Sequence, residues 1–237
     1  MISVCIATYN GSQYIEEQLY SILNQISIND EIIISDDNST DNTVEKIKKI
    51  NDNRIKIIIN QKEKGYTSNF ENAISHASGD YIFLCDQDDI WEENKVKFCL
   101  DKLATYDFIV SDASLINNKS ETIAESFYKK RIVYNSFLGN IYKFGYLGCC
   151  MAFRRKILNK ALPFPKNHRL CTHDNWLFLI AKAFYKTHIT QNKLIKYRRH
   201  TNNTSAGGLK NNTTLFFKLT YRLYLIIHIC KRITYRK

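Results

Sequence analysis

Short apolar runs alternate with amphipathic segments along the first half of the chain. The apolar runs lie at 2–7, 31–35, 54–59, 81–85 and 108–110. Helical patterns lie between them, at 14–23, 41–50, 68–77 and 94–104. Continuous apolar strands separated by helices are typical of a mostly parallel sheet that helices cover on both faces. The sequence therefore predicts one α/β domain, and 237 residues suit such a domain with an appendage.

Polar clusters follow three of these predicted strands, at the point where each strand ends. They are Thr8-Tyr9-Asn10, Asp36-Asp37-Asn38-Ser39 and Asp86-Gln87-Asp88-Asp89. Ligands of parallel sheets bind beyond the carboxyl ends of the strands. We therefore expect the three clusters to form one site on one rim of the sheet.

Asp86 and Asp88 stand two residues apart, directly after a buried strand. Hard divalent cations prefer carboxylate oxygens, and Mg²⁺ takes one or two carboxylates together with substrate phosphates. An isolated pair with this spacing is more typical of a solvated acidic turn. Its position beside two other polar clusters favours a metal that neutralises a departing diphosphate.

Asp36 and Asp37 end the second strand, and the next helix follows closely. Thr40 or Asp41 suits the N-cap of that helix, so part of the cluster is structural. Capping does not account for the two carboxylates before it. These side chains are suited to accept hydrogen bonds from a nucleobase imide or a ribose hydroxyl.

Five motifs in order resemble family-2 glycosyltransferases with the GT-A fold. The first three are the segments 4–10, 36–41 and 79–89. The later His173-Asp174-Asn175-Trp176 and the segment 198–203 are similar to motifs of a bacterial subgroup that builds rhamnose-containing and related surface polysaccharides. The resemblance covers roughly residues 1–205.

The resemblance implies a role for each matching position. The nucleotide-sugar site would comprise Thr8, Tyr9, Asp36, Asp37, Asp86, Gln87, Arg198 and Arg199. A divalent metal, Mg²⁺ or Mn²⁺, would be held by Asp86, Asp88 and His200. The acceptor side would include Trp91, Gly148 and Trp176, with the Trp176 ring placed to stack on a sugar. Asp174 would be the catalytic base of an inverting reaction.

Plainer interpretations of three of these residues stay open. Asp174 also suits the start of a helix predicted at 175–184. A lone histidine such as His200 is more often a surface or core residue than a ligand. Arg198 and Arg199 suit phosphate, but Arg199 equally suits a solvated loop.

The expected function is transfer of a sugar from a nucleoside diphosphate to a hydroxyl of a growing cell-surface glycan. One alternative is a nucleotidyltransferase, which needs a glycine-rich loop with basic residues after the first strand. The loop Thr8-Tyr9-Asn10-Gly11 contains no Lys or Arg. A second is a non-catalytic module that binds nucleotide sugars. Retention of Asp174 beside the metal motif argues against that module.

The charge is unevenly distributed. Thirteen of the 34 Lys and Arg follow Asp174, and no Asp or Glu does. Residues 1–174 therefore contain 21 basic and 23 acidic side chains. A basic C-terminal third indicates an anionic partner. No nucleic-acid module accompanies it, and no nucleic acid is expected.

We expect a GT-A domain at 1–208 and a basic amphipathic tail at 209–237. One interpretation of the tail is a helix on anionic lipid, near a lipid-linked glycan acceptor. The other is a helix packed on the domain with its basic residues in solvent. The seven cysteines contain no C-x-x-C pair, which argues against structural zinc and a disulfide framework. With no signal-type segment at the start, the expected location is the cytoplasm, peripheral on the inner face of the membrane if the tail binds lipid.

Overall fold

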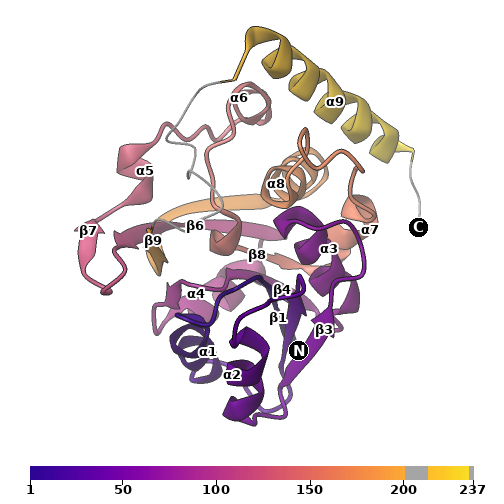
Figure 1. Cartoon of the computed structure of the whole chain (residues 1–237). Helices are drawn as coiled ribbons and strands as arrows, with labels where there is room; N and C mark the ends of the chain where they lie inside the picture. Colours follow the sequence, from indigo (N-terminus) through magenta and orange to yellow (C-terminus); the bar gives the residue numbers. More distant parts are fainter. Residues whose placement is uncertain (201–212, 235–237) are drawn as a thin grey trace.

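The computed structural model describes residues 1–200 and 213–234, in which strands and helices alternate as predicted (Figure 1). The strands are β1 (Ile2–Thr8), β2 (Glu31–Asp36), β3 (Ile55–Ile59), β4 (Tyr81–Asp86), β5 (Ile90–Trp91), β6 (Phe108–Ile116), β7 (Thr122–Ala124), β8 (Met151–Arg154) and β9 (Thr187–Arg198). The helices are α1 (Ile15–Leu23), α2 (Thr43–Ile50), α3 (Tyr66–His76), α4 (Lys95–Leu103), α5 (Phe127–Lys130), α6 (Phe137–Tyr142), α7 (Leu158–Ala161), α8 (His173–Phe184) and α9 (Leu215–Ile233), with 3₁₀ turns η1 (Gly148–Cys150) and η2 (Arg155–Ile157).

The strands form one sheet in the order β3-β2-β1-β4-β8-β6-β9-β5, and β7 pairs with β6. The strands β1 to β4 are mutually parallel, and β6 is parallel to β9. The direction reverses at β8, which is antiparallel to both β4 and β6. The predicted parallel sheet is therefore the half that carries the three polar clusters.

The register of β1 brings the three strand ends together. Thr8 lies opposite Asp36 on one side, and Ala7 lies opposite Asp86 on the other. The clusters predicted to share a rim therefore start from neighbouring positions. Helical spacing fixes the layer beneath: Ile15 and Leu19 of α1 fall on one face and are fully buried.

The segment before β8 contains a tight turn. A 3₁₀ turn at Gly148–Cys150 directly precedes the short strand Met151–Arg154. The Cys150 N–H donates to the Leu147 carbonyl at 3.2 Å, and the buried Lys95 Nζ approaches the Cys149 carbonyl at 3.5 Å. This turn moves Gly148 and Cys149 out of the sheet and under the rim.

Helix α9 lies along the edge of the molecule, next to α6 and α8 (Figure 1). Its exposed large apolar side chains are Leu215, Phe216, Leu219, Leu223, Ile226, Ile227 and Ile233. At 100° per residue they fall within about 120° of the helix circumference. Arg232 is buried and donates to the Pro163 carbonyl, and Arg222 donates to the Tyr142 carbonyl at 2.8 Å. The packed alternative predicted the basic residues in solvent, whereas part of the basic stripe faces the domain and the apolar face points outward.

The predicted domain boundary at 208 lies outside the described residues. Within 1–200 and 213–234, no helix has both the length and the apolar character needed to cross a membrane. All seven cysteines are free thiols, and only Cys230 is exposed. The other six are buried and pack as small apolar side chains.

Glu31 joins four segments at the amino-terminal edge of the parallel strands. Its carboxylate accepts hydrogen bonds from Ser3 Oγ at 2.6 Å, from Ser78 N at 2.6 Å and from Lys56 Nζ at 2.7 Å. Burial alone would raise the pKa of Glu31, but the hydrogen bonds from Lys56, Ser3 and Ser78 outweigh it and lower this pKa to about 2. The folded state therefore favours the ionised form.

This network predicts a specific acid sensitivity. Because the pKa of Glu31 is lower in the folded state, its stabilisation is present above the pKa of an unfolded Glu and is lost as pH falls toward 2. We expect Glu31→Gln to remove roughly 1–3 kcal/mol of the pH-dependent change in unfolding free energy between about pH 5 and pH 2. Urea unfolding across that range measures it, with the exposed Glu93→Gln as control. If the unfolding free energy of Glu31→Gln fell with pH as steeply as that of the wild type, the lowered pKa of Glu31 would be contradicted.

Candidate active site

The loops after β1 and β4 are fastened together at the rim. The Gln87 side-chain amide accepts from the Tyr9 N–H at 2.9 Å and donates to the Tyr9 carbonyl at 3.1 Å. A Cβ on Gly11 would lie 2.3 Å from the Gln87 Oε1, so only glycine fits beside this bridge. The Tyr9 ring is left 51% exposed at the rim, where it is available to a ligand.

The side chains of Thr8 and Asp36 form a hydrogen bond with each other below the rim. The Thr8 hydroxyl donates to Asp36 Oδ2 at 2.9 Å, and the other Asp36 oxygen accepts from the Ser39 N–H at 2.7 Å. Thr8 is 0% exposed and Asp36 is 1% exposed. The structure gives these two side chains a structural role in place of the predicted contact with the nucleotide, because they have no free surface to offer.

Asp37 lies next to this pair and fixes the loop that leads into α3. Its carboxylate accepts from Asn60 Nδ2 and from the Gly65 N–H, both at 2.8 Å. Gly65 has φ +127°, a conformation that favours glycine. A carboxylate has further lone pairs, so the predicted contact between Asp37 and a base stays a prediction.

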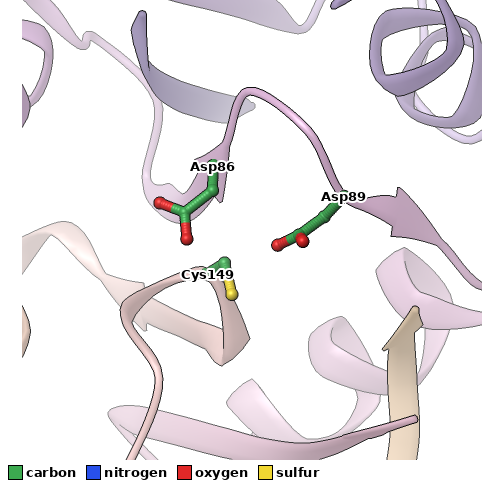
Figure 2. Close-up of side chains that lie close together, drawn as sticks. All are labelled: Asp86, Asp89 and Cys149. Atoms are coloured by element: carbon green, nitrogen blue, oxygen red, sulfur yellow. The ribbon is translucent and has the colours of Figure 1, made fainter. Parts of the chain in front are cut away.

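Asp86 and Asp89 point toward each other and toward Cys149, as Figure 2 shows. One ligand atom from each of the three lies within 4.8 Å of the others. Burial, then the charges of Asp88 and Asp174, raise the pKa of Asp86 to about 7. Burial, then the charges of Asp88 and Asp86, raise the pKa of Asp89 well above its usual range.

The cluster suits a hard divalent cation. Asp89 Oδ1 accepts from the Arg198 N–H at 2.9 Å, whereas the buried Asp89 Oδ2 has no hydrogen-bond partner among the described residues. Carboxylate oxygens that repel one another in a buried place are stabilised by a positive charge. Burial raises the pKa of the Cys149 thiol well above its usual range, so it stays protonated and the oxygens are the ligands such an ion would take.

Asp88, on the same loop, contacts His200. The distance between His200 Nε2 and Asp88 Oδ2 is 2.8 Å, and the Tyr14 ring lies 5.1 Å from the imidazole. The structure thus brings together two of the three residues predicted to hold a metal. Asp86 faces Asp89 instead, a neighbour to which the sequence had assigned no role.

Arg198 is the buried cation that positions this loop. Its Nε donates to the Asp88 carbonyl at 2.7 Å, and its Nη2 donates to Glu17 at 2.6 Å. The guanidinium stacks on Tyr14 at 4.5 Å and is 1% exposed. The prediction that Arg198 contacts phosphate is therefore wrong, because its side chain is enclosed. Arg199 is partly exposed beside Tyr197, and its predicted phosphate contact stays a prediction.

Asp174 stands in the first turn of α8 and faces the carboxylate cluster. Its Oδ1 accepts from Thr172 Oγ1 at 2.5 Å, and Thr172, not Asp174, is the N-cap residue. Burial, then the charges of Asp174 and Asp86, raise the pKa of Tyr66 to about 12. A Cβ on Gly148 would lie 3.2 Å from the Asp174 Cβ, and Gly148 directly precedes Cys149 of the carboxylate cluster. Asp174 and the cluster are therefore near neighbours.

Comparison with known proteins agrees with this arrangement. Residues 3–162 match the family described as Glycosyl transferase family 2. The chain belongs to glycosyl transferase family 2. Over 181 residues, 76% of this chain and 68% of the relative, it is 30% identical to the UDP-Glc:alpha-D-GlcNAc-diphosphoundecaprenol beta-1,3-glucosyltransferase WfgD of Escherichia coli. Over 234 residues, 92% of this chain and 77% of the relative, it is 29% identical to the dTDP-rhamnosyl transferase RfbG of Shigella flexneri.

The solved structures confirm the predicted GT-A fold. The structure of S. aureus TarS 1–349 in complex with UDP-GlcNAc superposes with a TM-score of 0.72 and 18% identity. The match covers 100% of this chain and 67% of that one. Both the resemblance and the fold expected from the sequence are therefore confirmed.

Two residues that the sequence placed on the acceptor side of this glycosyltransferase are buried. Trp176 is 0% exposed, its Nε1 donates to the Ala161 carbonyl at 2.8 Å, and Arg232 covers its ring at 5.6 Å. Trp91 is 3% exposed and packs against Phe83. Neither ring has a free face for a sugar, so both predictions are wrong.

Gly148 lies next to Asp174, and its lack of a side chain has a reason. Its predicted place on the acceptor side stays a prediction. A Cβ there would lie 2.6 Å from His173 Nε2 and 3.2 Å from the Asp174 Cβ. His173 is buried, stacks on Phe70 at 4.1 Å, and has no hydrogen-bond partner for either ring nitrogen among the described residues. Burial lowers the pKa of His173 to about 4, so the imidazole is neutral.

Sequence reasoning missed Asp89, Cys149 and Tyr66 as members of the site. Asp89 adjoins the two carboxylates that had been singled out, so adjacency was a usable signal. Cys149 carried no signal, because a thiol reaches the cluster only through the unexpected 3₁₀ turn. Tyr66 is the first residue of α3, so its place near Asp86 and Asp174 depends on where that helix begins.

The burial of Arg198 leads to a testable prediction. Arg198→Met would leave the buried Asp88 and Asn117 carbonyls without their donor, and we expect a loss of roughly 2–4 kcal/mol in the free energy of unfolding. Glu17→Gln is the control, since Glu17 is 48% exposed and its loss should cost much less. Urea unfolding gives both values. Equal, small effects would show that Arg198 does not hold the loop.

Proposed function

We propose that this glycosyltransferase moves a sugar, with inversion and with a divalent metal, from a nucleoside diphosphate sugar to a hydroxyl of a growing cell-surface glycan. The observation that carries the proposal is the shared space between Asp174 and the Asp86–Asp89 loop. The charge of Asp174 contributes to the raised pKa of Asp86, which indicates that the two are within electrostatic reach. A base and an anion-binding centre are thus available to one substrate.

The donor is assigned from the site and from the relatives together. WfgD and RfbG are named for UDP-Glc and dTDP-rhamnosyl donors, and TarS was solved with UDP-GlcNAc. The exposed Tyr9 ring and the Asp37 carboxylate are suited to bind the base of such a donor. Arg199 is suited to its phosphates.

The carboxylates suit Mg²⁺ or Mn²⁺, with Asp86, Asp88 and Asp89 as oxygen ligands and His200 beside Asp88. When bound, such an ion would neutralise charge on the leaving diphosphate. Arg198 keeps the loop in place from beneath, and Gln87 fastens it to Tyr9. These residues supply a preorganised anion site.

Asp174 is proposed as the general base. The acceptor oxygen forms a bond to the anomeric carbon while the bond from that carbon to the diphosphate oxygen breaks, and the acceptor proton passes to Asp174. A single displacement of this kind inverts the anomeric centre and needs one base. Thr172 orients the carboxylate through Oδ1.

Two variants separate the base from the metal site. Asp174→Asn should keep nucleotide binding and lower the transfer rate by about 10²–10⁴-fold, the range for a lost general base. Asp88→Asn should instead weaken Mn²⁺-dependent nucleotide binding. Calorimetric titration with UDP, dTDP and GDP, and a transfer assay over a donor panel, measure the two effects. Loss of nucleotide binding in Asp174→Asn would remove Asp174 from the base role, and normal transfer without divalent metal would remove the metal from the proposal.

The outward apolar face of α9 supports a place at an anionic membrane surface, where a lipid-linked glycan acceptor would be presented. Lys231 borders that face on one side and Arg222 on the other. A helix with this arrangement is typical of those that lie in the headgroup region. A peripheral position on the inner face of the cell membrane follows from this proposal.

Polar replacement on this face tests the membrane contact. Each Leu that enters the lipid contributes about 1.5–3 kcal/mol, so Leu219→Gln with Leu223→Gln should weaken binding by tenfold or more. Sedimentation with vesicles of equimolar phosphatidylcholine and phosphatidylglycerol measures it. Ile28→Gln, at a 77% exposed position outside α9, is the matched control. Unchanged sedimentation of the double variant would exclude α9 as the contact.

A further inference from the structure

We propose that the cavity between α6 and α9 binds the diphosphate of a lipid-linked acceptor, next to the catalytic base. This inference rests on the proposed function, and it adds a site for the anionic part of the acceptor. The cavity lies on the side of the domain that α9 covers (Figure 1). The donor carboxylates, by contrast, stand at the rim of the sheet.

The cavity is basic and aromatic. It has a volume of about 290 Å³, and its lining includes Tyr142, Lys143, Phe217, Lys218, Tyr221 and Arg222. No carboxylate lines it, and among the described residues neither Lys143 nor Lys218 pairs with one. Three cations at one concave place, without an acid, create a positive potential that favours an anion.

Arg222 shows how the cavity is prepared for a ligand. The guanidinium lies 4.7 Å from the Tyr142 ring, and its Nη2 donates to the Tyr142 carbonyl at 2.8 Å. The buried Nε has no hydrogen-bond partner among the described residues. The contact with the Tyr142 carbonyl therefore holds the side chain in position and uses one of the five N–H donors of the guanidinium. A guanidinium of this kind suits phosphate oxygens.

The cavity adjoins the proposed base through a single contact. Tyr221 lines the cavity, and its hydroxyl accepts a hydrogen bond from the Asn175 amide, directly after Asp174. Burial raises the pKa of Tyr221, and the charge of Asp174 adds to this rise. An acceptor whose diphosphate occupied the cavity would thus carry its sugar close to Asp174.

The orientation of α9 favours a diphosphate that is linked to a lipid over a free diphosphate. Lys218 and Arg222 line the cavity on the inner side of the helix, while Leu219 and Leu223 are exposed on its outer face. A lipid chain can follow the apolar face while its diphosphate turns inward around the helix. A diphosphate diester keeps negative charge at neutral pH, which matches the basic lining.

Binding of farnesyl diphosphate in EDTA tests the cavity apart from the donor site. Without a divalent ion the rim carboxylates repel a diphosphate, so binding reports on the basic cavity. Lys143→Gln with Lys218→Gln should weaken binding by about tenfold or more, since two charge contacts are lost. The matched control is Lys231→Gln, an exposed cation of α9 outside the cavity. Lys143→Arg with Lys218→Arg should restore the affinity.

Three results would overturn the proposal. They are an unchanged affinity in the double Gln variant, an equal loss in Lys231→Gln, and equal binding of uncharged farnesol by the wild-type protein. Displacement of farnesyl diphosphate by UDP in EDTA would place it in the donor site and would also overturn the proposal.

A transfer assay with a glycosyl-diphosphate lipid acceptor separates this inference from the proposed function. The double Gln variant should raise the acceptor KM by about tenfold and leave the donor KM unchanged. A change in the donor KM alone would count against the cavity. Absence of transfer from any donor by the wild-type protein would refute the proposed function, whereas the EDTA titration would still decide whether the cavity binds diphosphate.

Discussion

Mutual repulsion among buried carboxylates is the constraint on which the rest of the site depends. Asp86, Asp88 and Asp89 lie in four consecutive residues, and Asp174 faces them from another element. Like charges at such spacing destabilise a fold unless cations or donors compensate them. Arg198 supplies a guanidinium beneath the loop and an N–H to Asp89. The part of the repulsion that Arg198 does not offset is what makes the loop a good place for a metal and a diphosphate.

The parallel half of the fold could be predicted from the sequence because its signals are local. Apolar runs fixed the strands, and the strand ends placed Asp86 beside Thr8 without any tertiary information. Which polar side chains face a ligand could not be predicted in this way. Thr8 and Asp36 have the right chemistry for a nucleotide, but they satisfy each other in the interior. The sequence gives the residue type at a strand end. Only the tertiary packing decides whether that side chain contacts a ligand or another residue of the protein.

The mistaken acceptor residues have a related cause. Trp176 lies two residues after Asp174, the proposed base, and a sequence offers no way to separate a ring that lines a site from one that closes the core. Helix α8 is buried on most of its surface, so an aromatic residue in its first turn is enclosed. Arg198 was assigned wrongly because an arginine next to a second arginine is expected at the surface, where it can contact phosphate. Its partners Glu17 and Asn117 come from distant segments, which no local pattern connects.

Helix α9 is oriented by backbone carbonyls more than by its apolar residues. Arg232 and Arg222 donate to the carbonyls of Pro163 and Tyr142, which few other donors could reach. Satisfying these acceptors turns the basic stripe inward, and the apolar stripe must then face outward. Of the two interpretations of the tail, the packed one turned its basic residues to solvent, whereas the lipid-bound one left the apolar side outward. The amphipathic pattern could not choose between them, because the choice depends on carbonyls of distant segments. An outward apolar face costs free energy in water, which is why the proposed membrane contact is placed on this face.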